Sequence, residues 1–220
     1  MKKQENSKYV PALGFHWLTS YYDVVIRATA REHTFKMALI EQSNLEKNHQ
    51  VLDLASGTGT LSIWLKEAQP LANVIGVDGD PTILSIAAAK AQKANVSIQF
   101  DHALSNNLPY PEAYFDRVVS SLFFHHLSWE NKEHTVKELY RVIKPGAELH
   151  VADWGQADNL LMRGLFFLVQ IVDGFENTQD NVSGKLVALF ENAGFIEVTQ
   201  RKTFSTIYGT LSLYSAAKPA

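Results

Sequence analysis

The stretch VLDLASGTGTLSIWL, residues 51–65, constrains the fold more than any other part of the chain. Apolar residues lead to an acid, then to a patch of small residues with Gly57 and Gly59, then to apolar residues again. Two glycines one residue apart, at the opening of a helix, let the backbone approach a ligand closely. We therefore expect a buried strand over 49–55, a glycine turn and a helix over 58–68.

Strand-like and helix-like segments alternate along most of the remaining chain. Asp80 before Pro81 and Ser128 before Trp129 are typical helix starts, because short polar side chains cap the first free N–H groups. We expect further strands over 73–78, 96–100, 115–123 and 147–154, and helices over 82–94, 129–143 and 184–192. This alternation predicts a parallel sheet with helices on both faces.

The C-terminal part breaks the alternation. The runs FIEVTQRKTF and TIYGTLSLYSAA both resemble strands, and only a short connection joins them. A parallel crossover needs a dozen or more residues, so these two strands should be antiparallel. We expect a mostly parallel sheet with one reversed strand near an edge.

Composition excludes several classes of protein. A chain of 220 residues with 46% hydrophobic residues suits one domain with an added lid. The net charge of −3 argues against nucleic-acid partners, and the lack of cysteine excludes disulfides and thiolate chemistry. The start of the chain has no apolar secretory segment, and the apolar run over 160–172 is shorter than the ~20 residues that span a bilayer. We expect a cytoplasmic protein without an integral membrane segment.

The acids around the glycine turn indicate the kind of ligand. A dinucleotide fingerprint would carry a third glycine where Ser62 stands, which weakens the dinucleotide interpretation without excluding it. Asp53 would repel a pyrophosphate and attract a positively charged ligand, or it merely caps the loop through nearby N–H groups. Asp78 ends the second expected strand, where an acid can accept hydrogen bonds from two ribose hydroxyls. Asp80 already supplies the helix cap.

Five motifs in order carry a resemblance to a known family. VLDLASGTG, VIGVDGDPTIL, LPYPEAYFDRVVSSLFFHHL, LYRVIKPGAELHVADW and ENAGFIEV resemble class I S-adenosylmethionine-dependent methyltransferases, in particular the ubiquinone/menaquinone-biosynthesis type. The resemblance implies an α/β, Rossmann-like methyltransferase fold with a seven-stranded sheet in the order 3-2-1-4-5-7-6 and strand 7 antiparallel. It also implies an N-terminal helical cap over the cofactor site (1–45) and a core (46–220) with a lid insertion near 155–183.

The same resemblance implies S-adenosyl-L-methionine as cofactor and S-adenosyl-L-homocysteine as product. His102 stands where the family usually has an acid that reaches the adenine amino group, and a neutral imidazole can still accept that hydrogen bond. The cofactor-binding residues carried over are Asp53, Ala55, Ser56, Gly57, Gly59, Asp78, Gly79, Asp80, His102, Ala103, Ser120 and Leu122.

Residues for the methyl acceptor are less specified. His126 and Asp153 are the candidates for catalysis, with His125 beside them, and each can instead be a structural residue that packs or caps. No metal is expected, because Asp180 and Asn181 do not match the position of a metal-ligand pair. We expect six aromatic residues to line an acceptor pocket: Tyr21, Tyr22, Trp154, Phe166, Phe167 and Phe175. Ordinary packing against the core would equally explain these residues.

The leading hypothesis is a methyltransferase that acts on a small, apolar or aromatic acceptor by in-line displacement. Two alternatives stay open: an NAD-dependent oxidoreductase, and a cofactor-binding protein without turnover. The expected partners are a small-molecule acceptor and no nucleic acid, in a monomer or homodimer.

Overall fold

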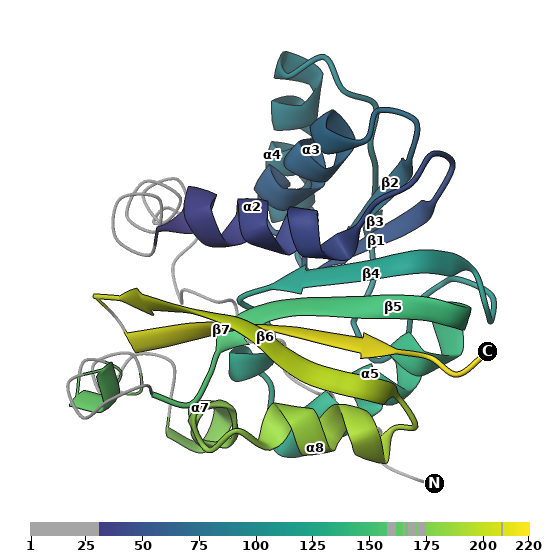
Figure 1. The fold of residues 1–220 in the computed structure, drawn as a ribbon. Helices are drawn as coiled ribbons and strands as arrows, with labels where there is room; N and C mark the ends of the chain where they lie inside the picture. Colours follow the sequence, from purple (N-terminus) through teal and green to yellow (C-terminus); the bar gives the residue numbers. More distant parts are fainter. Residues whose placement is uncertain (1–30, 158–161, 165, 167–169, 171–174, 208) are drawn as a thin grey trace, which may run out of the picture.

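The computed structural model describes residues 31–157, 162–164, 166, 170, 175–207 and 209–220. Its centre is a seven-stranded sheet in the order β3-β2-β1-β4-β5-β7-β6, which confirms the predicted fold class and strand order (Figure 1). The strands are β1 (Gln50–Leu54), β2 (Asn73–Asp78), β3 (Gln99–His102), β4 (Phe115–Ser121), β5 (Ile143–Trp154), β6 (Ile196–Thr206) and β7 (Gly209–Ala217).

The reversed strand is also confirmed. Strands β1 to β5 pair in parallel, whereas β7 runs antiparallel to both β5 and β6. The connection from Thr206 to Gly209 is too short for a crossover, so β6 and β7 form a hairpin at the edge of the sheet.

Helices cover both faces of this sheet (Figure 1). One face carries α2 (Glu32–Ser43), α3 (Thr60–Ala68) and α4 (Pro81–Lys93), and the other carries α5 (Trp129–Val142), α7 (Phe175–Val182) and α8 (Lys185–Asn192). A short 3-10 helix, η2 (Phe124–His126), links β4 to α5. The caps work as predicted: Asp80 accepts from the N–H of Thr82, and Ser128 accepts from that of Asn131.

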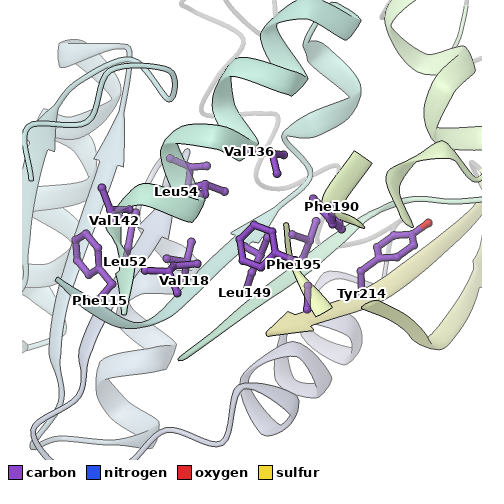
Figure 2. Packing of buried hydrophobic residues seen from close by; sticks show 14 of the residues in the cluster. Leu52, Leu54, Phe115, Val118, Val136, Val142, Leu149, Phe190, Phe195 and Tyr214 are labelled. Carbon is purple, nitrogen blue, oxygen red and sulfur yellow. The ribbon is translucent and has the colours of Figure 1, made fainter. Parts of the chain in front are cut away.

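The core has two parts because side chains alternate along each strand. Leu52 and Leu54 face α5 and α8, where they join the cluster drawn in Figure 2 with Phe190 and Tyr214. Val51, one residue before Leu52, instead joins a second cluster with residues of α2 and α3. Asp53 follows the same alternation, so its carboxyl group points toward α3 rather than toward α5.

Several predicted boundaries were wrong. Strand β3 spans Gln99–His102 rather than 96–100, because its register is set by pairing with β2, in which Ile75 faces Gln99. Strand β4 ends at Ser121 rather than at 123, since Leu122 has a φ of 55° and leaves the extended conformation. Helix α5 ends at Val142, and β5 already begins at Ile143 rather than at 147.

The expected N-terminal cap is described only from residue 31 onward, and 1–30 lie outside the described residues. Within the described part, α2 packs against β4, β5 and α3, with Phe35 and Leu39 fully buried. In the part of the chain that the structure describes, no helix combines the length and the apolar character needed to cross a bilayer.

Candidate functional site

The turn after β1 is built from residues in the left-handed backbone region. Ala55, Gly57 and Gly59 have φ values of 57°, 52° and 76°. The N–H of Ser56 donates to the carbonyl of Val77 at 2.9 Å, and the N–H of Gly59 donates to the carbonyl of Ser56 at 2.9 Å. One hydrogen bond therefore joins the turn to β2, and another lies within the turn itself, before α3 begins.

The two glycines of this turn have different surroundings. A Cβ atom at Gly59 would lie 2.9 Å from the Cβ of Ala87 and 3.0 Å from the Cζ of Phe100, so Gly59 permits close packing of the turn against α4 and β3. Among the described residues, no atom lies within 4 Å of a Cβ atom placed at Gly57. Within that part of the chain, the backbone at Gly57 therefore leaves space for a ligand.

Asp78 connects this turn to the end of β2. Its Oδ2 accepts from the N–H of Gly57 at 2.9 Å, and its Oδ1 accepts from the N–H of Asp80 at 3.0 Å. Burial raises the pKa of Asp78, and the two N–H groups partly offset that effect. Each carboxylate oxygen has two lone-pair sites, so Asp78 keeps acceptor capacity toward a ligand.

Residues from β3 complete the same edge. The Nε2 of His102 lies 3.0 Å from the carbonyl oxygen of Gly79, and the N–H of Ala103 donates to the carbonyl of Asp78 at 3.2 Å. His102 is exposed and belongs to the last position of β3. The predicted cofactor residues of β1, β2 and β3 thus meet at the carboxyl ends of adjacent strands.

Asp53 accepts from both the hydroxyl and the backbone N–H of Ser62 in α3, and its role toward a ligand stays a prediction. Its carboxyl group, 1% exposed, accepts from the hydroxyl of Ser62 at 2.5 Å. Burial raises the pKa of Asp53 to about 7, more than the Ser62 hydrogen bond and Lys36 lower it. The residue at the position of the missing third glycine therefore binds Asp53 from within α3.

Ser120 and Leu122 lie where β4 ends. The hydroxyl of Ser120 is buried and donates to the carbonyl of Leu54 at 3.0 Å, so it joins β4 to β1. Leu122 is half-buried, and its N–H donates to the carbonyl of Ala152 at 2.8 Å. Of the two, Leu122 alone keeps part of its side chain exposed at this edge of the sheet.

Asp153 lies at the end of β5, and its two oxygens accept four hydrogen bonds. Oδ2 accepts from the N–H groups of Phe123 (3.1 Å) and Phe124 (2.7 Å). Oδ1 lies 2.7 Å from the Nδ1 of His125 and accepts from the N–H of Trp154 at 2.7 Å. Burial raises the pKa of Asp153, but His125, the N–H of Trp154 and His126 together lower it below its ordinary value. This carboxylate anchors η2 to β5, while its proposed catalytic role stays a prediction.

His126 occupies the last position of η2, and its ring centroid lies 3.9 Å from that of His125. Burial, followed by the neighbouring His125, lowers the pKa of His126 to about 3. The imidazole is therefore neutral near pH 7 and can accept a hydrogen bond, but it is a weak proton acceptor. Its use as a general base stays a prediction that this pKa makes less favourable.

The predicted pocket walls are only partly described. Trp154 and Phe166 pack edge to face at 5.5 Å, and both are almost fully buried in the core on the α2 face. Tyr21, Tyr22, Phe167 and the side chain of Phe175 lie outside the described residues. Trp154 and Phe166 therefore pack against each other, and an acceptor pocket around them stays a prediction.

Sequence reasoning missed Lys132 and Asn177. The Nζ of Lys132 donates to the carbonyl of Asn177 at 2.6 Å, and the side-chain amide of Asn177 donates to the carbonyl of His126 at 3.2 Å. Asp180 pairs with Lys185 at 2.9 Å, and the described residues hold no group of three His, Cys, Asp or Glu side chains arranged for a metal ion. The only local signal for Lys132 is its place on the apolar side of α5.

Comparisons with known proteins show which proteins this chain resembles. A family model for a methyltransferase domain matches residues 51–146. A demethylmenaquinone methyltransferase from Thermus thermophilus is 39% identical over 48% of this chain and 47% of its own length. A second, from Deinococcus radiodurans, is 29% identical over 76% of this chain and 68% of its own length. The matched region thus spans about half of the Thermus relative.

Solved structures agree on the fold. The YcgJ protein from Bacillus subtilis superposes with a TM-score of 0.70 at 17% identity and covers 86% of this chain and 99% of its own. This likeness confirms the predicted fold, and the family match over 51–146 agrees with the resemblance that the five sequence motifs carry.

Proposed function

We infer that the chain is a class I S-adenosylmethionine-dependent methyltransferase of the ubiquinone/menaquinone-biosynthesis type, and from that premise we propose that it methylates the ring of a quinone-type acceptor. The names of the Thermus and Deinococcus relatives support this acceptor class. The structural observation that carries the proposal is the open backbone at Gly57 beside Asp78.

The residues at this edge fit the cofactor. Asp78 retains acceptor sites for two ribose hydroxyls, and Gly57 leaves space for a ligand against the turn. The Ser56 hydroxyl is buried and has no hydrogen-bond partner among the described residues, as expected of a group that a ligand satisfies. Bound there, the cofactor would supply a methyl group on a cationic sulfur.

The chain's own residues position this chemistry. Asp78 and the Gly57 backbone would hold the nucleoside, while Asp153 fixes η2 through the N–H groups of Phe123 and Phe124. The neutral His126 would accept a hydrogen bond from an acceptor hydroxyl and so orient the ring. Orientation rather than proton removal is the role that its low pKa supports.

Binding and turnover test the proposal separately. Calorimetry should show that S-adenosylmethionine binds and that NAD does not. With a demethylmenaquinone analogue, reduced to its hydroquinone, wild-type protein should release S-adenosylhomocysteine and a product heavier by one methylene. If NAD binds and S-adenosylmethionine does not, the cofactor assignment is wrong. If S-adenosylmethionine binds but no reduced quinone is methylated, the result favours a binding protein without turnover.

Two glycines give a matched test of the cofactor turn. Gly57 and Gly146 both have positive φ values, 52° and 74°, and a Cβ at either would meet no atom of the described residues within 4 Å. Gly57→Ala and Gly146→Ala should therefore lose a similar stability, about 1 kcal/mol, from backbone strain. Only Gly57→Ala should weaken S-adenosylmethionine binding, by at least about tenfold, because its methyl group enters the proposed ligand space. Equal affinities of the two variants in calorimetry would place the cofactor elsewhere.

A further inference from the structure

Lys132 is a fully buried lysine that the proposed chemistry does not use. It lies on α5, with a side chain that is 0% exposed. Lysine is almost never fully buried unless it is paired, because an ammonium loses its hydration in the interior. We therefore expect its ammonium group to have hydrogen-bond or ion-pair partners that offset the lost hydration.

Those partners lie on α7. The Nζ of Lys132 donates to the carbonyl of Asn177 at 2.6 Å and lies 3.8 Å from the Oδ2 of Asp180. Burial lowers the pKa of Lys132 below its ordinary value, and the charges of Asp180 and Asp153 offset only part of that effect. A carbonyl and a carboxylate from one helix thus receive the ammonium of another.

Asn177 extends this contact to the candidate site. While its backbone carbonyl accepts from Lys132, its side-chain Nδ2 donates to the carbonyl of His126 at 3.2 Å. Asp153 holds the other side of η2 through the N–H groups of Phe123 and Phe124. The short helix η2, which carries His126, is therefore hydrogen-bonded both to Asp153 of β5 and to Asn177 of α7.

We propose that Lys132 is a positioning residue: its ammonium orients Asn177, holds α7 against η2 and thereby sets the place of His126 at the acceptor side of the site. This inference rests on the proposed function only for the role of His126. The docking of α7 on η2 is a property of the protein without acceptor, and it can be measured by itself.

Amide hydrogen exchange on the full chain tests the docking. Lys132→Met removes the charge and keeps the length, Lys132→Arg keeps a cationic donor, and Lys185→Met is the matched control. Lys185 pairs with the same Asp180, but its side chain is 56% exposed. Exchange in α7 and η2 should accelerate at least about tenfold in Lys132→Met, the size expected of a charged hydrogen bond, and less in Lys132→Arg. Lys185→Met should exchange as the wild type does.

If amide exchange in α7 of Lys132→Met is unchanged, the proposal fails. It also fails if exchange in strands β1 and β4 accelerates as much as in α7, because a uniform effect reports general destabilisation. If Lys132→Met does not fold, Asn177→Asp serves instead, because it replaces the amide donor to His126 with an acceptor. It should accelerate exchange in η2 at least about tenfold, and wild-type exchange there would equally overturn the proposal.

Turnover separates the two proposals. In Lys132→Arg, the KM for the quinone acceptor should rise while the Kd for S-adenosylmethionine stays within about twofold of wild type. An unchanged acceptor KM, with α7 exchange accelerated, would overturn the role in positioning His126. If the wild type methylates no quinone, the proposed function fails, whereas the exchange result still decides whether Lys132 docks α7.

Discussion

Asp53 of β1 shows how a buried residue just before the glycine turn contributes to stability. Its carboxyl group is buried against α3 and bonded to the Ser62 hydroxyl, so it joins β1 to α3. Burial raises its pKa to about 7, well above the ordinary 3.8. Asp53 therefore carries a proton in the folded state at pH values where it is ionised in the unfolded chain.

This difference predicts a pH effect of defined sign. Because the folded pKa is raised, the stabilisation from Asp53 is fully present below pH 3.8 and is lost as the pH rises toward about 7. Asp53→Asn keeps an acceptor for Ser62 and should remove this loss. The free energy of unfolding, measured by urea titration at pH 5 and pH 8, should fall less with rising pH in Asp53→Asn than in wild type. A parallel pH dependence of the two proteins would contradict the raised pKa.

At the scale of elements, η2 depends on a residue from a distant strand. Asp153 of β5 meets the N–H groups of Phe123 and Phe124, which precede it by 30 and 29 residues. A 3-10 helix this short has little stability of its own, so these bonds determine where its histidines lie. Asp153 can accept all four hydrogen bonds around η2 only while its carboxylate is ionised, because a protonated carboxyl group carries an O–H donor.

Asp153→Asn should therefore be strongly destabilising. An amide presents one acceptor and one donor group to a site that holds four donors, so at least one buried donor loses its partner. We expect a loss of about 3 kcal/mol in urea unfolding, against less than about 1 kcal/mol for the control Asp101→Asn. Asp101 accepts from Tyr110 and Gln99 at the partly exposed end of the sheet. Comparable losses in the two variants would show that Asp153 does not anchor η2.

At the scale of the whole molecule, α2 is joined to the sheet through His150. The Nε2 of Gln42 donates to the carbonyl of Tyr214 at 2.9 Å and lies 3.2 Å from the Nδ1 of His150, whose Nε2 lies 3.1 Å from Glu148. A groove of about 460 Å³ opens beside these residues, between α2 and strands β5, β6 and β7. His150 is 2% exposed, and burial lowers its pKa below the ordinary 6.5 even though Glu148 raises it.

A buried neutral histidine makes the fold sensitive to acid. Because the folded pKa lies below 6.5, the unfolded chain binds more protons as the pH falls below that value, and stability decreases. His150→Gln should lose less free energy of unfolding than wild type between pH 7.5 and pH 5. His134→Gln, at an exposed position of α5, is the control and should follow the wild type. If His150→Gln and wild type lose the same free energy of unfolding between pH 7.5 and pH 5, His150 is not the source of the acid sensitivity.

Local patterns in the sequence were sufficient to predict most helices and strands, the antiparallel C-terminal pair and the glycine turn, whereas the order of the strands in the sheet came from the family resemblance. Apolar alternation marks strands, capping residues mark helix starts, and a short connection forces β7 to run antiparallel, all within a few residues of chain. Gly57, Asp78 and Asp80 were predicted to lie together in the same way, because strands of a parallel sheet bring their carboxyl ends to one edge, while their contact with a cofactor stays a prediction.

Tertiary structure alone decided the partners of the buried polar groups. Ser62 for Asp53, the η2 N–H groups for Asp153 and Asn177 for Lys132 are contacts between different elements, and nothing in the local sequence specifies them. Strand β3 moved to 99–102 for the same reason, since pairing with β2 set its register. Propensity and periodicity act over one or two turns of chain, whereas a buried charge or an edge strand takes the partner that the packed fold brings to it.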